Sequence, residues 1–243
     1  MVATVLQLSD THLRADPSDT SHQRHPDARL RSAIEAAAEA VAASGTAVDL
    51  VLLTGDLTDD ASEEACRRVA LLVAPLGAPV LAVPGNHDAG PEVTATFGPP
   101  RPVEVGEWRV AAAASNLAGR IDGGVDPAGL LAAIDALDDR PTVLAVHHPP
   151  AGPSSHPWFQ LAGAGELLAG LEGRPHVRIV ASGHLHQPFE VHRGRLAILG
   201  APSTLYGIRH SGDGWAPDDT IPTGGRLLIL QPDGAWRSEL VTT

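Results

Sequence analysis

Short apolar segments alternate with helix-like periodicities along the chain, a pattern typical of an α/β fold. Most of the apolar runs are short and continuous, which predicts strands that are buried on both faces. The predicted strands are residues 2–8, 49–53, 79–83, 108–113, 142–146, 177–181, 195–199, 226–230 and 236–241, and we expect the last three to form an antiparallel stretch. The predicted helices begin at Asp27 and end at Gly45, run from Ser62 to near Gly77, and span residues 126–137.

Neither the pattern nor the composition shifts abruptly anywhere in the 243 residues. With 43% apolar residues, no repeat and no low-complexity linker, the chain is expected to form one domain over residues 1–243. Polar residues from Ser9 onward interrupt the first apolar segment, and no window approaches the length of a membrane span or a signal peptide. We therefore expect a soluble, cytoplasmic protein that makes no membrane contact.

The charged residues and the cysteine count exclude several classes of function. The chain has 29 acidic residues against 17 basic ones, a net charge of −12, so binding of a nucleic-acid polymer or an anionic membrane by charge is not expected. All basic residues are arginine, and the lack of lysine excludes Schiff-base and P-loop chemistry. The single cysteine, Cys66, excludes an internal disulfide and a cysteine-based zinc cluster. The bias toward Ala, Arg and Pro is typical of a GC-rich bacterial genome.

Polar residues that can bind metal follow the ends of five predicted strands. In α/β sheets the carboxyl ends of the strands are where sites form, so we expect these residues to converge. The candidate ligands are Asp10, His12, Asp56, Asn86, His147, His184 and His186. Gly55, Gly85 and Gly183 each stand directly before a candidate ligand, at a sharp turn where a positive φ or a close backbone contact favours glycine.

This set of ligands predicts a centre with two metal ions. Carboxylate, amide and imidazole groups favour Mn, Fe or Zn over Ca or a thiolate-bound ion. Seven ligands are too many for one tetrahedral zinc, and they suit two ions that share one carboxylate. Each motif alone is more often a surface turn or a helix cap, but all five in this order and strand context indicate a metal site. The other histidines are expected to be ordinary surface or supporting residues, among them His22, His25, His176, His192 and His210.

Taken together, these motifs resemble those of the calcineurin-like metallophosphoesterases. The resemblance spans residues 4 to about 200, and the forms Ser9-Asp10-Thr11-His12 and Gly55-Asp56-Leu57-Thr58-Asp59 are most similar to class III cyclic-nucleotide phosphodiesterases and bacterial glycerophosphodiesterases. His12 and Asp59 stand where purple acid phosphatases have other residues. The resemblance implies a four-layer αββα sandwich, in which two packed mixed sheets are flanked by helices.

The resemblance also implies a role for each candidate residue. Asp10, His12 and His186 would hold one metal ion, Asn86, His147 and His184 would hold the second, and Asp56 would bridge both. His87 would face the leaving group and protonate it, and we expect Asp88 to orient the imidazole of His87. His148 would lie behind the ligands or face the substrate. Two such ions imply in-line attack on phosphorus by a metal-bound hydroxide.

The predicted substrate is a small phosphodiester, foremost a 3',5'-cyclic nucleotide. Selectivity would come from two loops rich in Gly, Pro, aromatic and His residues, 149–161 and 206–225, with Trp158 and Tyr206 as candidate substrate contacts. Ala114 departs from the carboxylate that near relatives usually have at this position. The main alternative is a phosphomonoesterase on the same metals. A non-catalytic scaffold of this fold is expected to lack a ligand or the leaving-group histidine, and here none is missing.

Overall fold

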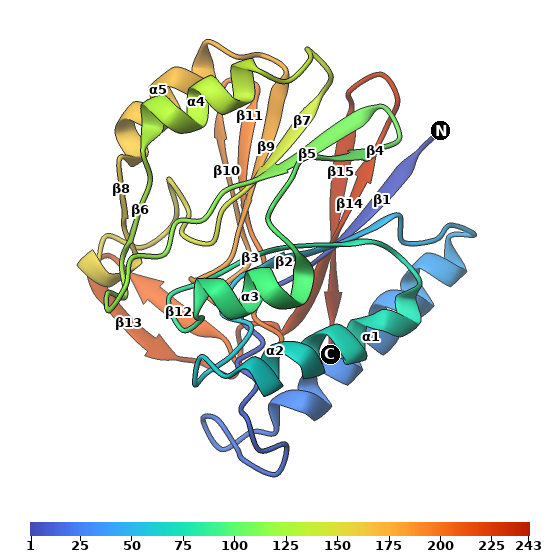
Figure 1. The fold of residues 1–243 in the computed structure, drawn as a ribbon, viewed down its shortest axis with the longest axis vertical. Helices are drawn as coiled ribbons and strands as arrows, with labels where there is room; N and C mark the ends of the chain where they lie inside the picture. The colour runs from blue at the N-terminus through green and yellow to red at the C-terminus, as the bar shows by residue number, and fades with distance from the viewer.

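Two mixed β-sheets pack face to face and are covered on their outer faces by helices (Figure 1). The computed structural model describes residues 1–243. The first sheet has the strand order β15-β14-β1-β2-β3 and the second the order β10-β11-β9-β7-β5-β4. The first contains β1 (Ala3–Leu8), β2 (Leu50–Thr54), β3 (Val80–Val83), β14 (Gly224–Leu230) and β15 (Trp236–Thr242). The second contains β4 (Val103–Val105), β5 (Trp108–Ala112), β7 (Thr142–Ala145), β9 (Val177–Ser182), β10 (Phe189–Arg193) and β11 (Leu196–Gly200).

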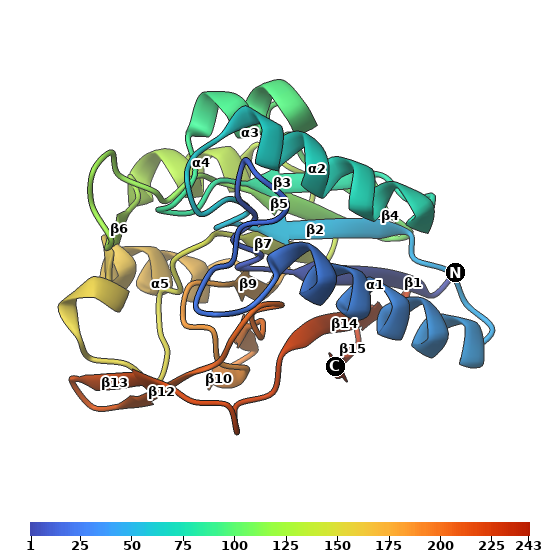
Figure 2. The same ribbon diagram turned by 90° about the horizontal axis from the view of Figure 1, so that it is seen from below.

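The helices form the two outer layers, which lie at opposite ends of the view in Figure 1. The first sheet is covered by α1 (Pro26–Ala43), α2 (Glu63–Val73), a 3₁₀ turn (Ala74–Leu76) and α3 (Gly90–Phe97), and the second by α4 (Pro127–Asp135) and α5 (Ala164–Glu172). No helix combines the length and the apolar character that crossing a membrane requires. Outside the main sheets, β6 (Gly123–Gly124) pairs with β8 (Leu161–Ala162), and β12 (Ile208–Ser211) pairs with β13 (Gly214–Pro217) in a hairpin at one edge of the molecule (Figure 2).

Successive side chains of each strand point to opposite faces of its sheet, which divides the apolar core into three layers. In β1, Val5 faces the second sheet, whereas Leu6 faces the helices, and both are fully buried. The layer between the sheets also contains Trp108, whose indole nitrogen donates to the carbonyl of Gln231 at 2.8 Å. The third layer packs α4 and α5 on the outer face of the second sheet. This arrangement confirms the predicted αββα sandwich.

Every predicted strand and helix forms, with boundaries shifted by one to a few residues. The expected antiparallel stretch is wrong in part: β14 and β15 pair antiparallel, but β11 pairs parallel with β9 in the other sheet. The structure adds α3, α5, β4, β10 and the β12–β13 hairpin, which were not predicted. The added strand β10 lies at a sheet edge and exposes polar side chains, so it lacks the continuous apolar run that marks a buried strand.

The parallel strands of both sheets end at the same edge. Leu8 lies opposite Leu53 and Thr54 lies opposite Val83, so the loops that follow β1, β2 and β3 are neighbours. In the second sheet, β7, β9 and β11 are also parallel. Gln7 connects the two sheets at this edge, because its amide nitrogen donates to the Thr54 hydroxyl at 3.1 Å and to the Ser182 carbonyl at 3.0 Å. The five loops with candidate ligands therefore meet at one place.

Asp88 fastens the loop after β3 to the loop after β2. Its buried carboxylate accepts hydrogen bonds from the backbone N–H groups of Leu57 at 3.1 Å, Thr58 at 2.8 Å and Gly85 at 2.8 Å, and from the Thr58 hydroxyl at 3.0 Å. The expectation that Asp88 orients the imidazole of His87 is therefore wrong. Both of its oxygens are used on buried backbone donors, which would otherwise lack partners.

Replacing Asp88 by Ala should lower the free energy of unfolding by on the order of 3 kcal/mol, because three buried N–H groups lose their acceptor. Asp88→Asn, which keeps one carbonyl oxygen, should lower the free energy of unfolding by less. The measurement is urea unfolding of the metal-stripped protein, so that metal affinity does not contribute. Asp139→Ala, at an exposed aspartate, is the control. A loss in Asp88→Ala no larger than in the control would contradict this role.

Candidate metal centre

Three histidines of the candidate site are oriented by backbone carbonyl groups. His147 Nδ1 lies 2.7 Å from the Thr54 carbonyl, His184 Nε2 lies 2.9 Å from the Trp158 carbonyl, and His186 Nδ1 lies 3.1 Å from the Tyr206 carbonyl. A carbonyl oxygen only accepts hydrogen bonds, so each of these ring nitrogens carries the proton. In the neutral ring the other nitrogen offers a lone pair, as metal-binding histidines require. Burial lowers the pKa of His147, but Asp56 outweighs it and raises that pKa to about 9, so a metal ion that binds His147 would displace a proton.

The ring of His12 lies beside a carboxylate instead of a backbone carbonyl. Its Nδ1 lies 3.3 Å from Asp59 Oδ1, and its Nε2 lies 3.1 Å from His186 Nε2. Two ring nitrogens at this distance share a proton when no ion is present, and in neutral rings with the protons on the outer nitrogens both would offer a lone pair. A cation between them would then take the place of the proton. This pair of nitrogens therefore suits a metal ion.

Two buried aspartates complete the first potential cation position. Asp10 Oδ1 lies 3.4 Å from His186 Nε2, and its carboxylate also accepts from the backbone N–H of His184. Candidate ligand atoms of Asp10, His12, Asp56 and His186 all lie within 4.8 Å of one another. Burial raises the pKa of Asp10, but the charge and hydrogen bond of His186 outweigh it and lower the pKa to about 2. The carboxylate is therefore ionised at neutral pH, as a metal ligand must be.

Asp56 lies between the first position and a second one. Its Oδ2 is 4.0 Å from His12 Nε2 and 3.4 Å from His147 Nε2. On the second side, Asn86 Oδ1 lies 3.2 Å from the same nitrogen of His147. Burial raises the pKa of Asp56, but His147 and then His12 outweigh it and hold that pKa well below its usual range. The oxygens of Asp56 and Asn86 thus converge on one ring nitrogen of His147, and a cation bound there would take the place of the proton on that nitrogen.

Backbone strain is concentrated in the candidate ligands. Five of the seven have a positive φ, a conformation that costs about 1–3 kcal/mol in a residue other than glycine and that clusters at functional sites. The values are 52° for Asp10, 48° for His12, 48° for Asp56, 69° for His184 and 50° for His186. The sequence did not predict positive φ for the ligands themselves.

Two of the predicted glycines are required by close contacts in the loops. Gly55 has a φ of 91°, and a Cβ atom there would lie 2.4 Å from His147 Nδ1. A Cβ atom on Gly85 would lie 2.1 Å from Asp56 Oδ1. Any side chain at these positions would displace a candidate ligand, so the glycines let the loops approach each other.

His87 is the exposed histidine of the site. Its ring lies edge-on to the ring of His12 with 4.8 Å between centroids, and its Nδ1 is 3.5 Å from Asp59 Oδ1. Its backbone N–H donates to Asp56 Oδ1 at 2.9 Å. This placement leaves the imidazole free to reach a group bound over the two cation positions, with Asp59 rather than Asp88 as its carboxylate partner.

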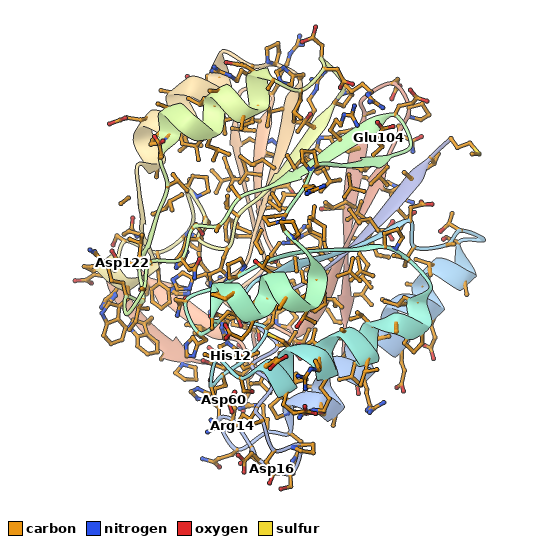
Figure 3. The ribbon with its side chains drawn as sticks, viewed as in Figure 1. His12, Arg14, Asp16, Asp60, Glu104 and Asp122 are labelled. Carbon is orange, nitrogen blue, oxygen red and sulfur yellow. The ribbon has the colours of Figure 1, made fainter.

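Asp59 was noted in the sequence only as a difference from purple acid phosphatases, yet it contacts three side chains. Besides His12 and His87, it accepts from Arg14 Nη1 at 2.6 Å. Burial raises the pKa of Asp59, but the hydrogen bond and charge of His12, followed by His87 and Arg14, outweigh it and hold that pKa below its usual range. Figure 3 shows His12 and Arg14 close together just below α3, whereas Glu104 lies at the opposite end of the molecule.

Of the two positions expected for His148, the structure shows the one behind the ligands. It is fully buried, its Nε2 lies 3.0 Å from the Ile121 carbonyl, and its Nδ1 lies 2.9 Å from the Ser115 hydroxyl. Burial, and then the neighbouring His147, lower the pKa of His148 to about 3, so the ring is neutral. Both ring nitrogens are engaged away from the site, and His148 is a supporting residue behind His147.

The two loops expected to contact substrate pack against each other beside the site, since the backbone N–H of Ser155 donates to the Gly212 carbonyl at 2.9 Å. Tyr206 packs against His186, with 4.4 Å between ring centroids. Phe159 packs against His184 at 5.3 Å, while Trp158 is 45% exposed and pairs with Trp215 at 5.8 Å. Of the two predicted substrate contacts, Tyr206 thus places its ring beside a candidate ligand, whereas Trp158 reaches His184 only through its backbone carbonyl.

Comparison with known proteins agrees with this geometry. The family model of the calcineurin-like phosphoesterases matches residues 3–188. A protein of Synechococcus named a probable cyclic nucleotide phosphodiesterase is 34% identical over 99% of this chain and 92% of its own length. The 3',5'-cyclic adenosine monophosphate phosphodiesterase CpdA of Pseudomonas aeruginosa is 34% identical over 95% of this chain and 86% of its own length. The corresponding CpdA of Escherichia coli is 31% identical over 97% of this chain and 88% of its own length.

A solved structure shows the same fold at low sequence identity. A dimetal phosphatase from Danio rerio superposes with a TM-score of 0.71 at 13% identity and covers 94% of this chain and 92% of that one. The family model covers most of the chain, and the relatives cover nearly all of it. The chain therefore belongs to the calcineurin-like phosphoesterase family of hydrolases.

Proposed function

We propose that the protein is a cytoplasmic, dinuclear metal-dependent phosphodiesterase that hydrolyses a small phosphodiester, foremost a 3',5'-cyclic nucleotide. The observation that carries the proposal is the position of Asp56 between two sets of inward-facing acceptors, one around His12 and one around His147. The names of the relatives support the substrate class, since they include phosphodiesterases of cyclic nucleotides. Manganese, iron and zinc all suit nitrogen and oxygen ligands of this kind.

Each side chain has a defined place in this proposal. Asp10, His12 and His186 hold the first ion, Asn86, His147 and His184 hold the second, and Asp56 bridges them. Two ions, when bound, polarise the phosphate and lower the pKa of a water nucleophile. The protein keeps the ligand rings in place through Thr54, Trp158, Tyr206 and Asp59, so little reorganisation is needed when the ions or the phosphate bind.

His87 is proposed to act on the leaving group. It is the one histidine at the centre whose side chain is substantially exposed, at 41%, while its ring is oriented by Asp59. Hydrolysis breaks a P–O bond, and the departing alkoxide needs a proton. His87 can donate that proton from the open side of the site, which is general-acid catalysis.

The substrate class is tested by initial rates of the metal-stripped enzyme reloaded with manganese. We expect hydrolysis of 3',5'-cyclic AMP, and a higher rate on bis-(p-nitrophenyl) phosphate than on p-nitrophenyl phosphate. A preference for the monoester would instead indicate a phosphatase on the same centre. Bound metal with no hydrolysis of any of the three would contradict the proposal.

Replacing His147 by Ala should reduce the manganese bound per chain from two ions to one, because only the second position loses a ligand. Metal content after dialysis, measured by inductively coupled plasma mass spectrometry, checks this. His192→Ala, at an exposed histidine on β10, is the matched control and should keep both ions. Two ions in the His147 variant would show that the second site is wrongly assigned.

Replacing His87 by Ala should leave the metal content unchanged and slow diesters with alkyl leaving groups by about a hundredfold or more. Diesters with a p-nitrophenolate leaving group, which departs without a proton, should slow much less. The test compares kcat for the two classes in wild type and variant. An equal loss across both leaving groups would count against the acid role.

A further inference from the structure

The loop between β1 and α1 contains a strained turn that the proposed mechanism does not use. His22 and Gln23 have φ values of 48° and 61°. The turn is closed by two backbone hydrogen bonds of 2.9 Å between Ser21 and Arg24, and Arg24 also donates to the His22 carbonyl at 3.0 Å. The guanidinium of Arg24 forms an ion pair with Asp219 of the loop after β13. These contacts hold the turn in a conformation that two non-glycine residues adopt only at a cost.

The turn places the imidazole of His22 flat against Tyr206. The two rings stack with 4.1 Å between centroids and 30° between planes. The Tyr206 ring in turn lies 4.4 Å from the ring of His186 and 6.1 Å from that of His12. His22 is therefore one aromatic ring away from two candidate ligands of the first cation position. It is itself exposed, so the stack ends in an accessible imidazole.

A surface pocket of about 550 Å³ opens at this imidazole. It is lined by His22, Gln23, Arg24, Pro217 and Asp219, so the ring of Pro217 is the one hydrocarbon side chain in a lining that is otherwise polar. Such a lining does not suit an alkyl or lipid group. An exposed ring beside an amide, a guanidinium and a carboxylate suits a flat ligand with hydrogen-bonding edges, which describes a nucleobase.

We propose that His22 is a specificity residue that stacks on the base of a nucleotide whose phosphate lies at the metal centre, with Tyr206 supporting the imidazole from behind. The inference rests on the proposed function for the position of the phosphate. It adds a base subsite built by the β1–α1 loop, whose histidine was expected to be an ordinary surface or supporting residue. Gln23 and Asp219 are placed to contact the edge of the base.

The test is calorimetric binding to the manganese-loaded enzyme of adenosine 5'-monophosphate and of ribose 5-phosphate, which lacks the base. Wild type should bind the nucleotide more tightly by about fivefold or more, the range that one stacked base contributes. His22→Ala should bring the two affinities within about twofold of each other and leave ribose 5-phosphate binding unchanged. His22→Phe, which keeps a flat ring, should retain the preference, and His192→Ala should match wild type.

Two results would overturn the inference. One is equal affinity of wild type for the two ligands, which would show that no base subsite exists. The other is an equal loss of both ligands in His22→Ala, which would mean that the residue acts on the metal centre through Tyr206. Failure of the enzyme to hydrolyse cyclic nucleotides, with a base preference that still depends on His22, would reject the proposed activity and support the subsite.

Discussion

The candidate site depends on hydrogen bonds made by the outer nitrogens of its histidines. The carbonyls of Thr54, Trp158 and Tyr206 each accept from one ring nitrogen of His147, His184 and His186, and so determine which nitrogen faces inward. The nitrogens of His12 and His186 lie 3.1 Å apart, with the Asp59 carboxylate beside His12. Ring nitrogens and carboxylates that are held together in this way suit a cation in place of the protons they share.

The sandwich keeps this arrangement in place against backbone strain. Five candidate ligands have positive φ, and such conformations persist only where surrounding contacts determine them. Those contacts come from both sheets: Gln7 joins the ends of β2 and β9, and Asp88 joins the loops after β2 and β3. The strained residues thus lie where parallel strands end. The buried side chains of Gln7 and Asp88, away from the metal positions, hold the surrounding loops in place.

The polar motifs at strand ends predicted that the candidate ligands converge, because the ends of parallel strands meet at one edge whatever the details of the loops. The resemblance to a known family supplied the two-sheet sandwich, which periodicity alone does not distinguish from other α/β folds. The role of Asp88 was wrong since adjacency to His87 in sequence does not determine where a carboxylate points. His148 could not be placed because a buried and a substrate-facing histidine look alike in sequence. The backbone carbonyls that orient the rings have no sequence signal, since every residue has one.

The central claim is that one preformed site holds two ions that share Asp56. The most direct measurement is a pair of crystal structures, metal-stripped and manganese-loaded, with anomalous data collected at the manganese edge. We predict two anomalous peaks on either side of Asp56, with the rings of His12, His147, His184 and His186 in the same orientations in both structures. A single peak, peaks away from Asp56, or rings that turn over when metal binds would contradict a preformed site with two ions.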